Sequence, residues 1–167
     1  MDNEKHHDCG CGHSHDEHDE CGCDCCQPII GDGTVDDREL SVLGALLGHH
    51  YLPVSRFVMC SSESDEVRFT ALAPVYLETK ADSMETVKER AALLLAMEAK
   101  ALISLDYDEP LQGYDYETHT DSDLFHYLES TVQEGRKSDS FLCDTAEVEC
   151  GSISITERGL TAVSAPQ

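Results

Sequence analysis

The sequence predicts a folded domain of the α+β class that is preceded by a tail of different composition. Apolar residues recur at helical spacing in some segments and alternate with polar residues in others, as in half-buried helices and strands. Composition changes abruptly near Gln27-Pro28, and Cys, His, Asp, Glu and Gly dominate everything before it. We therefore expect a tail over residues 1–27 and one folded domain over residues 35–165, with a turn at Gly31-Asp32-Gly33 between them.

The first expected elements of the domain are a helix and an extended segment. A helix is expected at about 37–48, with the acidic pair Asp36-Asp37 at its start, and Leu52-Pro53 ends or redirects it. Its apolar face carries Leu40, Leu43, Leu46 and Leu47. Residues 67–77 alternate as in a strand, and Pro74 favours an edge strand because proline lacks a backbone donor. A helix interrupted by Pro74 is the alternative.

The middle of the domain is expected to hold a second helix and a strand. Residues 82–85 have the spacing of a capping box, and a helix is expected at about 83–101. Its apolar positions are Met84, Val87, Ala91, Leu94, Leu95 and Leu102. Residues 103–107 then alternate as in a half-exposed strand that ends near Pro110.

The last third is expected to begin with a polar loop over residues 111–121. Leu124, Leu128 and Val132 form one stripe of a helix over residues 123–134, which Gly135 stops. A short strand at 152–155 and a turn or helix start at 156–160 complete the domain.

Charge limits the partners of this chain. The 34 acidic and 11 basic residues give a net charge of −23, and residues 27–167 alone carry −16. Such a chain repels phosphate backbones and anionic membranes and attracts cations and basic protein surfaces. The start of the chain does not resemble a signal peptide, and no apolar segment is long enough to span a membrane. We expect a cytoplasmic protein without membrane contact, in which clustered cysteines act as metal ligands.

The tail contains the strongest functional signal of the sequence. Thiolates and imidazoles are preferred ligands of zinc, and also of nickel, cobalt and copper(I), and the Gly and Ser spacers let a short backbone fold around an ion. Without metal we expect the tail to be disordered, because it has almost no apolar side chains to bury. The Cys-x-Cys repeats resemble the tails of metallochaperones and metallothioneins. The expected ligands are Cys9, Cys11, His13, His15, His18, Cys21, Cys23, Cys25 and Cys26.

Other metal-capable residues have a simpler interpretation. His49-His50 lies where a histidine favours a helix end electrostatically. Cys60, Cys143 and Cys150 are expected to be small core residues. His119 and His126 are expected at the surface.

Two segments resemble parts of winged-helix regulators of the MarR type. The run from Ala91 to Asp106 resembles the end of the DNA-reading helix and the first wing strand, and residues 152–160 resemble the second wing strand and the following helix. The resemblance implies a winged-helix-like domain in which residues 111–150 form an inserted segment containing a helix. Ala101 stands where that family usually has Gly, and no helix is visible directly before the candidate reading helix.

Two functions are compatible with these features. The chain is a metal-responsive regulatory or protein-interaction protein, or it is a metallochaperone or metal-storage protein that delivers Zn, Ni or Cu to a client. DNA is disfavoured because phosphate binding needs Lys and Arg, and the candidate reading helix carries as many acids as bases. No catalytic motif is present, so we do not expect an enzyme. The metal, the partner and the oligomeric state do not follow from the sequence.

Overall fold

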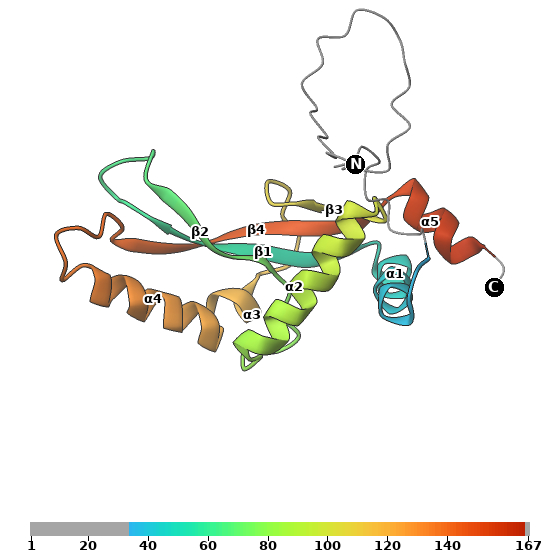
Figure 1. Cartoon of the computed structure of the whole chain (residues 1–167), viewed down its shortest axis with the longest axis horizontal. Helices are drawn as coiled ribbons and strands as arrows, with labels where there is room; N and C mark the ends of the chain where they lie inside the picture. Colours follow the sequence, from blue (N-terminus) through green and yellow to red (C-terminus); the bar gives the residue numbers. More distant parts are fainter. Residues whose placement is uncertain (1–33, 166–167) are drawn as a thin grey trace, which may run out of the picture. The chain divides into compact units, whose positions relative to one another are not determined.

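The computed structural model describes residues 34–165, which form a mixed α+β domain, as the sequence predicts (Figure 1). A four-stranded antiparallel sheet packs against helices. The elements are α1 (Asp37–His49), β1 (Tyr51–Cys60), β2 (Arg68–Val75), α2 (Met84–Ala99), β3 (Ile103–Asp106), α3 (Glu117–Thr120), α4 (Asp123–Gly135), β4 (Thr145–Ile155) and α5 (Glu157–Ser164).

The sheet is built around β1 and β4, in the strand order β2-β1-β4-β3. These two central strands pair without a register shift from Tyr51↔Ser154 to Cys60↔Thr145. The β1 strand is absent from the sequence-based assignment, which interpreted Pro53 only as a helix terminator. Pro53 is tolerated because β2 pairs with β1 only from Ser55 onward, so no ladder partner faces the proline on that side.

The β2 strand confirms the expectation of an edge strand for residues 67–77. It has one partner, β1, and its register shifts between Ser55 and Phe57 and again between Phe57 and Val58. Pro74 follows a cis peptide bond with Ala73 near the end of this strand. The free edge explains why a residue without an N–H donor is accommodated here.

The helix starts follow local side-chain chemistry. Asp36 and Glu39 form a reciprocal capping box at the start of α1. At α2 the expected capping box at residues 82–85 is wrong by one position: Ser83 is the N-cap and accepts the N–H of Thr86. Asp82 instead accepts hydrogen bonds from Glu78, Thr79 and Arg90, because the preceding turn brings these donors to its carboxylate.

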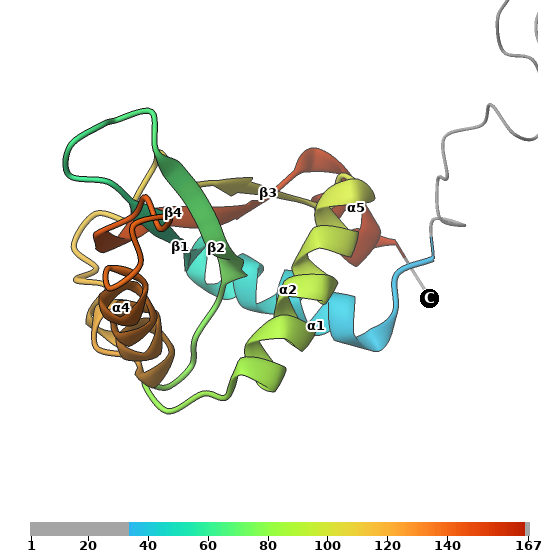
Figure 2. The ribbon, with the colours of Figure 1, turned by 60° about the vertical axis from the view of Figure 1, so that its left-hand side comes forward.

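The core consists of two clusters that lie along the sheet. The first joins α1, α2 and the β3 end of the sheet, with Leu43, Leu46, Leu94, Met97 and Ile153 almost fully buried. The second joins β1, β2, α2 and α4 through Phe57, Val75, Leu77, Val87 and Phe125. Figure 2 shows α1 and α2 together, with α4 away from them. Val54 belongs to the first cluster and Phe57 to the second. Because side chains alternate along a strand, these two residues, three positions apart, point to opposite sides of β1.

The elements on either side of α2 differ in kind. After α2, β3 pairs with β4 through Ile103↔Ile155, and α5 follows β4. Between these strands, residues 111–150 contain α3 and α4. Directly before α2, however, the described chain has the strand β2 rather than a helix. The elements at this position therefore do not form a helix-turn-helix.

Candidate functional site

The predicted metal ligands, Cys9 to Cys26, lie outside the described residues. Within residues 34–165, no three His, Cys, Asp or Glu side chains are grouped so that they could hold a metal ion. The prediction of a tail metal site therefore stays a prediction, and the described domain adds no metal centre of its own.

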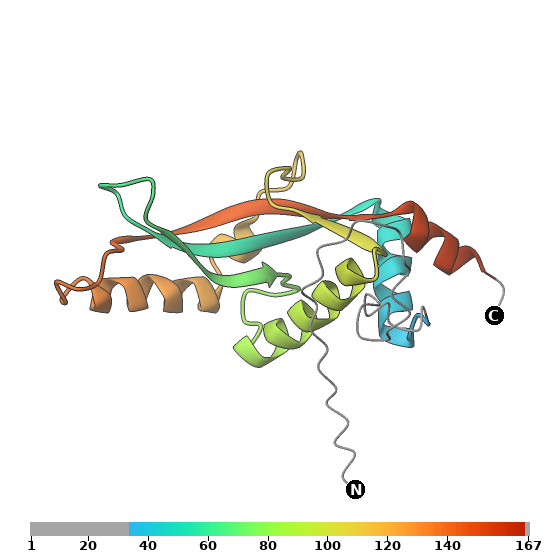
Figure 3. The same ribbon diagram turned by 45° about the horizontal axis from the view of Figure 1, so that its top comes forward.

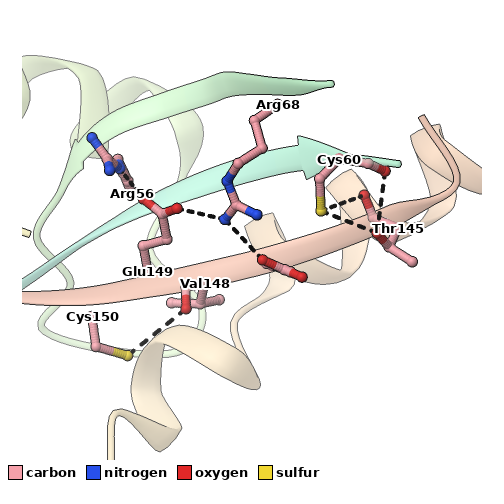
Figure 4. Close-up of polar contacts among 8 residues, drawn as sticks. Arg56, Cys60, Arg68, Thr145, Val148, Glu149 and Cys150 are labelled. Carbon is pink, nitrogen blue, oxygen red and sulfur yellow. Dashed lines mark hydrogen bonds and ion pairs between the residues drawn. The ribbon is translucent and has the colours of Figure 1, made fainter. Parts of the chain in front are cut away.

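The three cysteines of the domain belong to its interior, as expected for small core residues. Cys60 and Cys143 are buried, and Cys150 is partly buried. The Sγ atom of Cys60 lies 3.1 Å from Thr145 Oγ1 (Figure 4). Burial raises the pKa of Cys143, and the neighbouring Cys60 raises it further; burial also raises the pKa of Cys150. Since the thiolate is the metal ligand and the nucleophile, the raised pKa keeps the thiols of Cys143 and Cys150 protonated and unreactive at neutral pH.

His119 contradicts the expectation of a surface residue, because its side chain is 0% exposed. Its Nδ1 atom lies 2.7 Å from Ser55 Oγ, and its Nε2 atom has no hydrogen-bond partner among the described residues. Burial lowers the pKa of His119 to about 4. Helix α3 places the ring beneath β1, which the polar sequence around it does not indicate. Ser55 is also 0% exposed, so this pair is a polar contact of the core and not a surface dyad that a substrate could reach.

An ion-pair network covers the exposed side of the sheet at the β2 end. Arg56 and Arg68 both pair with Glu149 (Figure 4). Arg68 also pairs with Glu147. Burial alone would raise the pKa of Glu149, but the hydrogen bonds from Arg56 and Arg68 outweigh it and lower the pKa. Both arginines are thus neutralised by carboxylates of β4, and this face presents no uncompensated positive charge.

Arg90 of α2 and Lys100, the C-cap residue of this helix, are paired with carboxylates. Arg90 contacts Glu78 at 2.9 Å and Asp82 at 2.6 Å, and Lys100 contacts Glu39 at 2.8 Å. Lys88 is exposed on the same helix. The candidate reading helix therefore does not present a row of free cations.

A groove between α1 and α2, which we call the α1–α2 groove, has a mainly apolar lining. Its volume is about 430 Å³, within the range of small-molecule sites. Its lining combines apolar residues, among them Val42, Ala45, Leu93 and Leu94, with the charged residues Asp37, Arg38, Glu78 and Arg90. The two acidic and two basic residues of this lining balance, so they do not select a cation or an anion.

A second hollow, the loop groove, has a volume of about 740 Å³ and lies between the β3–α3 loop and the sheet. It is lined by residues 109–114 together with His49, Tyr51, Asp106, Ser152 and Ser154. Ser152 and Ser154 flank the core residue Ile153 on β4, so they point to the side of the sheet away from the first core cluster. Figure 3 shows the β3–α3 loop on the side of the sheet opposite α1 and α2.

Tyr116 holds the loop of this groove in place. Its hydroxyl accepts the N–H of Leu111 at 2.8 Å and donates to the carbonyl of Gly151 at 2.6 Å. Gly151 is needed at this point, because a Cβ there would lie 2.1 Å from the carbonyl oxygen of Asp106. The loop is therefore attached directly to β4, and its walls are formed before any ligand binds.

The sequence predicts the strands of the loop groove but does not reveal the groove. Ser104, Asp106, Ser152 and Ser154 occupy the polar positions of two alternating segments, which is an ordinary signal for a solvated face. Nothing in the spacing indicates that the loop folds back over these positions, since that depends on the contact between Tyr116 and Gly151.

The described helices include none that is long and apolar enough to cross a membrane. Comparison of the whole chain with protein-family models, with curated proteins and with solved structures gave no match.

Proposed function

We propose that this chain is a transition-metal-binding regulatory or interaction protein, in which the Cys/His-rich tail binds the metal and the acidic domain docks a protein partner with a basic surface. The observation that carries the proposal is the cluster of six cysteines and three histidines between residues 9 and 26. Zinc is the expected metal, with nickel, cobalt and copper(I) as alternatives, because these ions share a preference for thiolate and imidazole ligands.

The charge distribution of the domain supports a protein partner rather than DNA. Binding to DNA depends on Lys and Arg that neutralise phosphates. Arg56, Arg68, Arg90 and Lys100 are engaged by carboxylates of the domain itself. We propose that the winged-helix resemblance of the α2–β3 and β4–α5 segments reflects an interaction module.

A metallochaperone or storage protein is the second candidate. The Cys-x-Cys repeats favour it, because such repeats allow several exchangeable sites rather than one defined geometry. The two candidates differ in how the metal is held. A sensor needs one tight site whose occupancy changes the domain, whereas a carrier releases several ions readily to a competing chelator.

Metal analysis of untagged, reduced protein tests the shared claim. Full-length protein should bind more zinc than a 27–167 fragment, and cobalt should give thiolate charge-transfer absorption. A full-length variant with the six tail cysteines replaced by serine should lose this absorption, while a Cys60→Ser, Cys143→Ser variant should keep it. Equal metal content in the full-length protein and the fragment would disprove tail binding.

DNA binding provides the test between the two kinds of partner. We expect no measurable binding to duplex DNA at physiological salt, where even basic proteins bind non-specifically at only about 10⁻⁴–10⁻⁶ M. An anisotropy titration at low and physiological salt measures this. Micromolar binding that is lost on charge reversal at Lys88 and Arg90 would establish a DNA-binding regulator instead.

A further inference from the structure

We propose that the loop groove binds the guanidinium or ammonium group of a basic side chain that a protein partner presents. This inference rests on the proposed function in one respect, because it names the place where the acidic domain recognises its basic partner. Charge, free hydrogen-bond acceptors and exposed aromatic rings at the groove support it independently of one another.

The charge of the groove selects a cation. Asp106 and Glu109 contribute two carboxylates, and the described lining contains one imidazole, that of His49, but neither Lys nor Arg. Neither carboxylate is in an ion pair with a described residue, whereas Glu147 and Glu149 on the same sheet are both paired with arginine. A cation that enters the groove therefore meets carboxylates that no basic side chain of the described domain has neutralised.

Unused acceptors in the groove match the donors of a basic side chain. Ser152 is only 8% exposed, lines the groove and has a hydroxyl without a hydrogen bond to any described residue. Oδ1 of Asp106 accepts the N–H of Asp108 at 2.9 Å, and its second oxygen has no partner within residues 34–165. An ammonium has three N–H donors and a guanidinium has five, and neither accepts hydrogen bonds. Within residues 34–165 the one enclosed polar side-chain atom without a partner is His119 Nε2, so the Ser152 hydroxyl is open to the groove, where it can accept a hydrogen bond from a ligand that donates.

Two partly exposed tyrosines line the groove, so their rings are available to pack against such a cation. Tyr51 is 54% exposed and Tyr114 is 36% exposed, and both line the groove. The Tyr114 ring is held by an edge-on contact with Tyr116, with 4.8 Å between the ring centroids. Aromatic rings attract ammonium and guanidinium groups through the negative charge of their faces.

A metal ion fits the same groove less well. Ca²⁺ takes about six to eight oxygen ligands, and Mg²⁺ demands near-octahedral geometry. The groove offers two carboxylates, and the described residues contain no group of three metal-binding side chains. An organic cation needs only one or two carboxylates together with neutral acceptors and aromatic faces, which is the set present here.

The experiment is an NMR titration of the ¹⁵N-labelled, reduced, metal-free full-length chain. Acetyl-arginine-amide is the probe, and acetyl-citrulline-amide is its uncharged analogue of nearly equal shape. We expect saturable shifts of the amide signals of Asp106, Glu109, Ser152 and Ser154 with the arginine compound and none with the citrulline compound. Equal shifts with both compounds, or no saturable shift at these residues, would overturn the proposal.

Variants test whether the groove itself binds the probe. Asp106→Asn with Glu109→Gln should weaken binding at least about tenfold, since charge-assisted contacts of this kind are worth 1.4 kcal/mol or more. Asn at position 106 can still accept the N–H of Asp108. A matched control, Glu129→Gln with Asp139→Asn, removes two charges outside the groove and should change the affinity less than about twofold. If the double variant fails to fold, Glu109→Gln alone provides the test, because the Glu109 side chain has no hydrogen bond or ion pair with a described residue that it would lose.

The outcomes separate this inference from the proposed function. If both double variants weaken binding of the probe equally, the attraction is spread over the acidic surface. The groove is then not the binding site, while the proposal that the domain docks a basic partner stands. If zinc alone causes the same shifts and the same variants abolish them, the groove is a metal site and the proposal fails. Metal uptake by the tail is measured separately and does not depend on either result.

Discussion

At the scale of single residues, His119 shows how burial decides the role of a titratable group. Histidine is ordinarily the group that changes charge near neutral pH. Here the ring is enclosed beneath β1 with a neutral hydrogen bond to Ser55, and burial lowers its pKa to about 4. Protonation would place a charge in the core and an N–H at Nε2 that has no acceptor among the described residues. The neutral ring is therefore the folded form.

This histidine should make the domain less stable in mild acid. Its pKa is about 4 in the folded state and about 6.5 in the unfolded chain, so between these values the unfolded state binds more protons. The contribution of His119 to the free energy of unfolding is fully present above about pH 6.5. It falls as the pH drops toward 4, by roughly 3 kcal/mol in total. Urea unfolding at several pH values between 7.5 and 4.5 measures the loss.

A His119→Gln variant separates this effect from the titration of carboxylates. Glutamine offers a polar side chain near Ser55 but does not ionise, so the variant should be less stable at pH 7.5 and show a flatter pH dependence. Wild-type and variant proteins with parallel stability curves over this range would contradict the assignment.

At the scale of elements, the start of α2 distinguishes two capping arrangements that the sequence makes similar. The spacing of residues 82–85 suggests a cap by Asp82, but Ser83 caps the helix and Asp82 binds the turn before it. Burial alone would raise the pKa of Asp82. Hydrogen bonds from Arg90, Glu78 and Thr79 outweigh it and lower the pKa to about 2. Because the helix begins one residue later than the spacing suggests, Asp82 stabilises the β2–α2 turn instead of capping α2.

Substitution at this turn should reveal the arrangement. Ser83→Ala removes the N-cap acceptor and should cost about 1 kcal/mol of unfolding free energy. Glu85→Gln should change stability by less than about 0.5 kcal/mol, because Glu85 does not close a capping box in this helix. Chemical denaturation of both variants measures the difference. A larger loss from Glu85→Gln than from Ser83→Ala would restore the capping box centred on Asp82.

At the scale of the whole molecule, the excess of acidic residues dominates. Residues 27–167 carry a net charge of −16, and the ion pairs of the domain engage only part of its carboxylates. The remaining carboxylates repel one another across the folded surface. Salt screens such repulsion, since the Debye length falls from about 30 Å at 0.01 M to about 3 Å at 1 M.

The protein should therefore become more stable as salt increases. We expect the unfolding midpoint to rise by several degrees between about 0.05 M and 1 M NaCl, where 1 kcal/mol corresponds to about 2–4 °C for a chain of this size. Thermal unfolding measures the effect. A variant with Glu63, Glu66, Glu129 and Asp139 replaced by their amides should show a smaller rise. Destabilisation by salt would mean that the ion pairs, rather than the repulsion, dominate.

Local patterns were sufficient for much of the fold. The helices α1, α2 and α4 and the strand β3 follow apolar periodicity, and capping or glycine signals mark several of their ends. The alternation at residues 152–155 predicts the last third of β4, and Pro74 indicates an edge strand. These features depend on neighbours a few residues away, which is why they are visible without the tertiary structure.

The sequence by itself determined the α+β class, the acidic surface and the prediction of a metal-binding tail, because these depend on composition and short spacing. Only the tertiary structure decided that β1 lies at the centre of the sheet, that His119 is buried and that the loop groove exists. Each of these depends on a contact between residues far apart in the chain, such as Ser55 with His119 and Tyr116 with Gly151. Such contacts leave no periodic signal, since the two partners are chosen by packing rather than by their neighbours in sequence.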